Sequence, residues 1–237
     1  MTPKTFLFYT IIPLFLLASC KDTTNAKNVA VQPQKRKVVD SVSVEDKKKK
    51  EKEKFVLTED NAIEFFFNYN KTLKENTITL TTNFGDITIE LFDDVPYHKA
   101  NFIYLTRKGY FNDTYFHRIV KNFIIQGGNA DNVETGRKRG QIGRYLLPPD
   151  TRKGHKHHRG TVSMPSSEID NPHMLASPFE FFIVVTKPGS YHLDGDYTPF
   201  GKVISGMDIV DKINSQPVGQ GDWPIQNIYI LNAKVTK

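Results

Sequence analysis

The amino-acid sequence predicts a mainly β protein, a closed or nearly closed β-barrel capped by helices. Between residues 77 and 235 the chain is dominated by short apolar runs of strand length, separated by turns rich in glycine, proline or asparagine. Only two or three segments show the apolar spacing of a helix. Because the 237-residue chain contains a single cysteine, no internal disulfide can form, and the apolar core must stabilise the fold.

Residues 1–19 are typical of a signal peptide. Lys4 provides a positive start, and residues 6–17 form an apolar stretch that is shorter than the roughly 20 residues a bilayer span needs. The stretch ends in the sequence Leu-Ala-Ser followed by Cys20, which resembles the bacterial lipobox, where cleavage leaves a lipidated cysteine. We therefore expect lipidation of Cys20; the alternative is an ordinary cleavage site followed by a free cysteine.

Residues 20–54 have the composition of a disordered, charged tether. Residues 21–54 contain eleven basic and six acidic side chains and no apolar run that could pack. The tether and Lys4 account for the whole formal charge of +6, so residues 55–237 are neutral overall. The basic character is therefore no evidence for nucleic-acid binding, and attraction to anionic lipids is a secondary possibility for the tether.

The first folded segment is an N-terminal helical extension at residues 55–76. Its helix is expected at Glu59–Asn70, with Thr58 as a candidate N-cap. Apolar residues recur there at helical spacing, at Ile63, Phe66 and Phe67.

Residues 77–237 carry the strand pattern. Residues 77–92 alternate strictly around a glycine-containing turn and predict a β-hairpin. Asp94 is a candidate cap for a helix that has Pro96 in its first turn and ends near Gly109. Residues 129–160 read as a loop rich in glycine, arginine and proline. The remaining elements are two strands within 115–128, strands at Thr161–Met164, Glu180–Thr186, Pro199–Val203 and Asn227–Val235, and a short helix at Met207–Ile213.

Two polar residues interrupt the strands at 115–128. Alternation places Arg118 on the face opposite His117, and Gln126 on the face opposite Ile125. These polar groups belong either to a solvated edge strand or to a cleft on the surface of the sheet.

Four short motifs decide between these alternatives. They are FHRIV at 116–120 with FIIQGG at 123–128, GTVSM at 160–164, EFFI at 180–183, and LDG at 193–195 with FGKV at 200–203. In this order they resemble the signatures of the cyclophilin family of peptidyl-prolyl cis–trans isomerases, and with the lipobox the chain resembles a bacterial lipoprotein form. The resemblance covers about residues 77–237.

The resemblance implies a closed eight-stranded antiparallel barrel capped by two helices, to which this chain adds the N-terminal helix. It also implies a filled barrel interior and an active cleft on the outer face. The catalytic residues would be Arg118 and Gln126. The substrate-binding residues would be Phe123, Ile124, Glu180, Phe182, His192, Leu193 and Tyr197.

This set of residues suits the isomerisation of X–Pro bonds. The barrier to rotation is about 18–20 kcal/mol because the amide has partial double-bond character. Twisting leaves a lone pair on the nitrogen, and the Arg118 guanidinium can donate to it more strongly than to the planar amide. Apolar side chains would hold the proline ring. No metal and no cofactor is required.

Some positions depart from the family pattern. Glu180 stands where glutamine is usual, and it is expected to pair with Arg118, to favour basic residues beside the proline, or to be a partly exposed carboxylate. Pro165 changes a peptide-contacting position. His192 replaces the tryptophan of members that bind cyclosporin tightly, which predicts weak sensitivity. Tyr197 is read as pocket wall.

Other side chains are given no catalytic role. His155, His157 and His158 lie in a basic loop without a cysteine or carboxylate at ligand spacing, so a metal site is not expected. His117 is expected to be a buried structural histidine, and Trp223 a packing residue.

The sequence thus predicts a membrane-anchored lipoprotein of the cell envelope, on the periplasmic or surface side, that isomerises X–Pro bonds in envelope proteins and assists their folding. The alternative is a cyclophilin-like peptide-binding or chaperone module with little isomerase activity, which Glu180 and Pro165 would favour.

Overall fold

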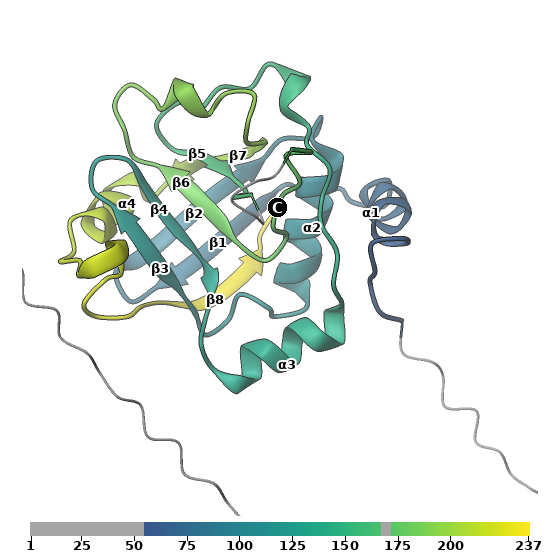
Figure 1. The fold of residues 1–237 in the computed structure, drawn as a ribbon, viewed down its shortest axis with the longest axis horizontal. Helices are drawn as coiled ribbons and strands as arrows, with labels where there is room; N and C mark the ends of the chain where they lie inside the picture. Colours follow the sequence, from purple (N-terminus) through teal and green to yellow (C-terminus); the bar gives the residue numbers. More distant parts are fainter. Residues whose placement is uncertain (1–54, 167–171) are drawn as a thin grey trace, which may run out of the picture. The chain divides into compact units, whose positions relative to one another are not determined.

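Eight strands form the predicted closed antiparallel barrel, in the order β1-β2-β7-β5-β6-β4-β3-β8 (Figure 1). The computed structural model describes residues 55–166 and 172–237, so the expected signal peptide, Cys20 and tether lie outside the described residues. The strands are β1 (Thr77–Thr82), β2 (Gly85–Leu91), β3 (Thr114–Val120), β4 (Ile124–Asn129), β5 (Thr161–Ser163), β6 (Phe181–Val184), β7 (Pro199–Ser205) and β8 (Ile228–Val235).

The β1–β2 hairpin shows how strand alternation fills the barrel. Ile78 pairs with Ile89 and Leu80 with Ile87, and all four side chains are fully buried. The alternate position places Thr79 Oγ1 3.2 Å from Thr88 Oγ1 on the other face. Gly85, with φ +131°, closes the turn in a conformation that a residue with a side chain rarely adopts.

Two helices cover the barrel as expected. Figure 1 shows α2 (Pro96–Arg107) and α4 (Met207–Asn214) on opposite sides of the strands. From α2, the ring of Phe102 packs against that of Phe181 on β6 at a centroid distance of 5.4 Å and against that of Phe200 on β7 at 5.2 Å. The predicted cap of α2 is wrong: the N-cap is Val95, and Asp94 instead contacts Nε2 of His155 at 2.8 Å.

The N-terminal helix α1 (Ala62–Asn70) exists, but its buried face differs from the prediction. Its buried residues are Ala62 and Phe66, whereas Ile63 and Phe67 are 45% and 47% exposed. Thr58 does not cap the helix; its own N–H donates to Oδ1 of Asn61 at 2.8 Å. Aromatic rings of the domain select this face, since the Phe66 ring packs against Tyr104 and Tyr145.

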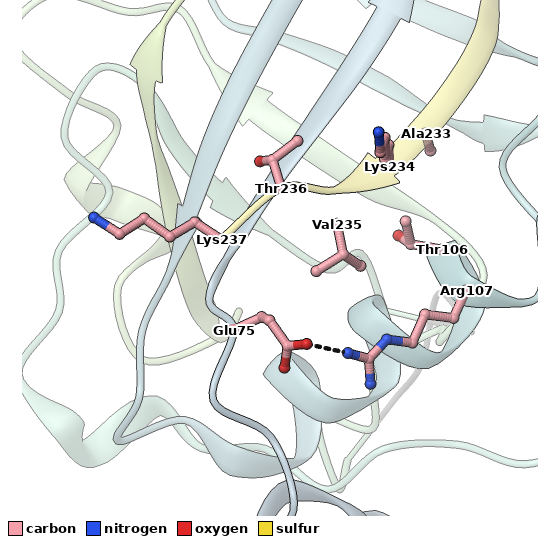
Figure 2. Close-up of a pocket in the computed structure, with 8 residues that line it drawn as sticks. All are labelled: Glu75, Thr106, Arg107, Ala233, Lys234, Val235, Thr236 and Lys237. Carbon is pink, nitrogen blue, oxygen red and sulfur yellow. Dashed lines mark hydrogen bonds and ion pairs between the residues drawn. The ribbon is translucent and has the colours of Figure 1, made fainter.

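Arg107 at the end of α2 ties the N-terminal extension to the domain. Its guanidinium donates to the Tyr69 hydroxyl at 2.9 Å and to Oε1 of Glu75 at 2.6 Å. Figure 2 shows this ion pair beside a pocket of about 440 Å³. Since Arg107 already has two partners, we assign this pocket no binding role. The pocket is lined by Glu75, Thr106, Arg107, Ala233, Lys234, Val235, Thr236 and Lys237.

A further helix, α3 (Val133–Ile142), lies where the sequence analysis expected only a loop. Asn132 caps it by accepting a hydrogen bond from the Thr135 N–H at 2.7 Å. The helix contains Gly136 and Gly140 and buries only two residues, Thr135 and Ile142, so the sequence has no apolar stripe to reveal it. Throughout the described part of the chain, no helix has the length and apolar character needed to cross a membrane.

Candidate active site

Three neighbouring strands bring the predicted catalytic residues together on the outer face of the barrel. Arg118 on β3 pairs in register with Gln126 on β4, and Gln126 pairs with Phe182 on β6. The adjacent residues Ile119 and Ile125 are fully buried in the barrel. Alternation therefore turns Arg118 and Gln126 outward.

The apolar residues predicted to hold the proline form one cluster on the same strands, which we call the aromatic cluster. Phe182 and Ile124 at its base are 3% and 5% exposed, so they already stand in a largely water-free environment. The Tyr197 ring meets the Phe182 ring edge-on, with centroids 5.6 Å apart. The members are Ile124, Phe182 and Val184, with Val120, Phe123, Leu193 and Tyr197 packed against them.

His192 lies at the rim of the aromatic cluster. Its imidazole stacks on the Phe123 ring at a centroid distance of 5.3 Å and an angle of 25°, and the residue is exposed. His192 therefore lies beside the aromatic cluster, and its ring is smaller than the indole of a tryptophan. The substrate-binding roles of these side chains stay predictions.

The polar groups are connected differently from the expectation. Gln126 Nε2 donates to Oε2 of Glu180 at 2.9 Å, and His117 Nε2 lies 3.5 Å from the same oxygen. Glu180 is therefore partnered by Gln126 and His117. Of the three alternatives for this residue, pairing with Arg118 is wrong, and the carboxylate is partly exposed, at 21%. The partner of Arg118 is Asp222, with Nη2 and Oδ2 3.4 Å apart.

Asp222 is a site residue that the sequence analysis missed. It ends the short helix η3 (Gln220–Asp222) with φ +63° and lies 104 residues from Arg118 in the chain. A carboxylate in a Gly-Asp-Trp-Pro loop carries no local signal that it meets this arginine. Both side chains of the pair are about two-fifths exposed, so water screens their attraction.

His117 is buried, as predicted, but the prediction that it faces away from Arg118 is wrong. The pairing of β3 with β4 shifts between Phe116 and Arg118, which places His117 in a β-bulge. A bulge adds one residue to a strand and breaks the alternation of faces. Consequently His117 reaches Glu180 on the outer face beside Gln126.

Glu180 is held as a carboxylate by its neighbours. Burial alone would raise its pKa, but the interactions with His117 and Gln126 and the charge of the Arg139 guanidinium lower the pKa below its ordinary value of 4.5. At neutral pH this side chain is therefore ionised and acts only as a hydrogen-bond acceptor.

The histidines of the basic loop point to separate partners. His155 meets Asp94, and His158 Nδ1 lies 2.9 Å from the Tyr191 hydroxyl. The fully buried His157 bridges Oδ1 of Asp194 at 2.8 Å and Oγ of Ser163 at 3.0 Å. Within residues 55–166 and 172–237, no three metal-binding side chains converge.

Ser163, His157 and Asp194 are hydrogen-bonded in the order of a hydrolytic triad, but a substrate cannot reach the serine. Ser163 is fully buried, so no substrate carbonyl reaches its hydroxyl. Burial lowers the pKa of His157, although the carboxylate of Asp194 opposes this effect. The His157 ring lies parallel to the Phe182 ring at 6.2 Å, so the chain supports the floor of the aromatic cluster.

Comparison with known proteins assigns the barrel domain to one family. Residues 77–235 match the family model described as cyclophilin type peptidyl-prolyl cis-trans isomerase/CLD. Peptidyl-prolyl cis-trans isomerase CYP18-1 of Arabidopsis thaliana is 40% identical over 154 residues, which cover 64% of this chain and 91% of that protein. Peptidyl-prolyl cis-trans isomerase B of Escherichia coli is 33% identical over 171 residues, covering 68% and 99%.

A longer relative and two solved structures agree with this assignment. Peptidyl-prolyl cis-trans isomerase-like 2 of Rhizopus delemar is 39% identical over 69% of this chain, but the match spans only 30% of that protein. The crystal structure of a cyclophilin type isomerase from Cryptosporidium parvum superposes with a TM-score of 0.58 at 29% identity, covering 69% of this chain and 98% of that one. The same Cryptosporidium protein in the presence of the dipeptide Ala-Pro gives a TM-score of 0.57 at 29% identity, covering 68% and 99%.

The chain belongs to the cyclophilin-type peptidyl-prolyl cis–trans isomerases. It is an isomerase of that class, and of the two functions considered from the sequence, the enzyme is the one supported.

Proposed function

We propose that this cyclophilin is a membrane-anchored lipoprotein of the cell envelope that isomerises X–Pro bonds in envelope proteins, with Arg118 as its catalytic cation. The observation that carries the catalytic part is the register of β3, β4 and β6, which sets Arg118 and Gln126 beside the aromatic cluster. A cation and an apolar surface for a proline ring are the two things the reaction requires.

The aromatic cluster binds the proline ring of the substrate. Burying a ring of this size against Phe182 and Phe123 contributes roughly 25 cal/mol for each Å² of apolar surface removed from water. With the ring held, the acyl side of the X–Pro bond rotates. The solved relative studied with Ala-Pro supports a proline-containing peptide as the ligand.

Arg118 stabilises the twisted bond. In the planar amide the nitrogen lone pair is delocalised, and in the twisted state it accepts a hydrogen bond. The guanidinium keeps its charge at every physiological pH and presents donors in a fixed plane. Asp222, at 3.4 Å, holds the guanidinium without burying it, so its remaining donors stay available to the substrate.

The anchor and the location rest on the N-terminal sequence. A signal-peptide pattern ending at Cys20 supports lipidation, and the polar residues that follow would tether the domain to the membrane surface. A lipid-anchored isomerase meets proteins of the envelope before other clients.

Expression of the full-length chain in a bacterial host with labelled fatty acid tests the anchor. Wild-type protein should incorporate the label and sediment with membranes, and the membrane fraction should accelerate isomerisation of a prolyl peptide. The variant Cys20→Ala should lose the label and leave the membrane fraction. Equal labelling of the variant and the wild type would contradict the anchor, and absence of isomerisation would contradict the enzymatic role.

A further inference from the structure

Large apolar side chains stand exposed next to the active site. Trp223 and Leu231 are each 50% exposed and Tyr229 is 39% exposed, and we call these three residues the outer strip. Isolated apolar side chains on a surface need no explanation, but apolar side chains gathered beside a binding site do.

Two ring contacts connect the outer strip to the active-site strand. The Trp223 ring lies 6.4 Å from the ring of His117 on β3, and the Tyr229 ring meets that of Tyr115, also on β3, at 6.1 Å. Tyr115 and His117 are two residues apart, so about 7 Å separates the two points of contact. The outer strip therefore begins beside His117, next to Arg118, and continues toward the N-terminal end of β3.

Strand pairing continues the strip onto β8. Tyr229 is paired in register with Tyr115, and β8 follows β3 in the barrel. Leu231 lies two residues beyond Tyr229, and both are exposed while Ile230 between them is fully buried. Alternation therefore turns Tyr229 and Leu231 to the same outer face as Arg118.

We propose that the outer strip binds a large apolar side chain of the proline-containing segment whose proline occupies the aromatic cluster. This inference rests on the proposed isomerase function and names its substrate class: unfolded segments with a bulky apolar residue about six positions from the proline. The continuity of the strip with the active-site strand identifies the same polypeptide as its occupant.

The spacing of the strands sets the distance along the substrate. The aromatic cluster is built on β4 and β6, and β8 lies two strands from β4, in the order β4-β3-β8. Neighbouring strands are about 4.8 Å apart, which gives about 10 Å across the sheet. Ile124 of the aromatic cluster pairs with Val120, whereas Tyr229 of the strip pairs with Tyr115, five residues away and so about 16 Å along β3. The strip at Tyr229 therefore stands about 19 Å from the proline site. An extended chain rises about 3.3 Å per residue, so the apolar residue stands about six positions from the proline.

Fluorescence of the single tryptophan reports on the outer strip directly, because Trp223 is a member of it. The probes are three Ala-Pro peptides of equal length: one with phenylalanine six residues before the proline, one with phenylalanine six residues after it, and one with serine at both positions. Each is titrated into the full-length protein, and cis–trans exchange of each is measured by NMR in parallel.

One of the two phenylalanine peptides should bind at least fivefold more tightly than the serine peptide and shift the Trp223 emission to shorter wavelength. Leu231→Ser should reduce this preference to less than twofold. Val133→Ser is the matched control, since Val133 is 90% exposed on α3 and lies outside the strip. It should preserve the preference.

Equal binding of all three peptides with unchanged emission would overturn the inference while leaving isomerisation intact. If no peptide is isomerised but the fluorescence preference is preserved, the proposed function is contradicted, whereas the binding surface is still supported. Sedimentation distinguishes a second copy of the chain as the occupant: a dimer that Leu231→Ser dissociates, with peptide binding unaffected, would also overturn the inference.

Discussion

Replacing Arg118 with alanine tests the proposed mechanism at its central group. The substitution removes the only proposed donor to the twisted amide nitrogen and leaves the aromatic cluster in place. A hydrogen bond from a charged donor contributes about 1.5–3 kcal/mol, and each 1.36 kcal/mol of transition-state stabilisation corresponds to a factor of ten. Because the Arg118 side chain is 43% exposed, water weakens the interaction, and we expect the lower part of this range. The predicted loss of kcat/KM is therefore about tenfold to thirtyfold.

The loss should not come from unfolding. Arg118 contacts only Asp222 among the ion pairs of the described residues, and an exposed pair of this kind contributes about 0–1 kcal/mol to stability. The free energy of unfolding should accordingly change by less than about 1 kcal/mol. Arg118→Lys should restore little activity, because an ammonium group does not reproduce the planar set of donors.

The assay is isomerisation of a prolyl peptide, with folding checked by circular dichroism and urea unfolding. Arg137→Ala serves as the control, because this arginine is 54% exposed and pairs with Glu134 within α3. Wild-type activity in a folded Arg118→Ala protein would refute the mechanism, and equal losses in both variants would show that the effect is not specific to the site.

Two further predictions concern histidines. His98 is fully buried, neither ring nitrogen has a hydrogen-bond partner in the described part of the chain, and burial lowers its pKa from 6.5 to about 3. Between the two pKa values the unfolded chain binds a proton that the folded chain does not, so the free energy of unfolding falls as the pH is lowered. Urea unfolding should show that the wild type loses about 1.4 kcal/mol more stability than His98→Leu when the pH is lowered from 7.5 to 5.5. His192→Trp should increase cyclosporin inhibition, since an indole would add apolar surface beside Phe123; equal inhibition of wild type and variant would contradict this.

Most of the barrel was predictable because the signal for a strand is local. Alternating residues such as Ile78 and Leu80 fill the interior, and the pattern identifies them without knowledge of their neighbours. Helix α3 was not predictable in this way, because its glycines and charged residues leave no apolar stripe. The face of α1 was predicted wrongly for a related reason: several aromatic residues share this helix, and only the packing of Phe66 against Tyr104 and Tyr145 selects which are buried.

In the site, too, the features with a local sequence signal were predictable and those that depend on tertiary contacts were not. The motifs identified Arg118 and all members of the aromatic cluster except Val120 and Val184, because these residues stand close together in the chain or in fixed signatures. The contacts between the polar groups depend on tertiary structure. Asp222 reaches Arg118 through a loop 104 residues away, and the bulge at His117 reverses the face that strict alternation predicts.

The replacement of glutamine by Glu180 is compatible with catalysis because it fixes the neighbouring amide. A glutamine at this position can donate or accept, so the amide of Gln126 could be bound in either orientation. An ionised carboxylate only accepts, and the lowered pKa of Glu180 keeps it ionised at neutral pH. Gln126 must therefore turn Nε2 toward Glu180, as the 2.9 Å hydrogen bond shows. In the mechanism we propose, its carbonyl oxygen is then the acceptor left for an N–H of the substrate, beside the donors of Arg118.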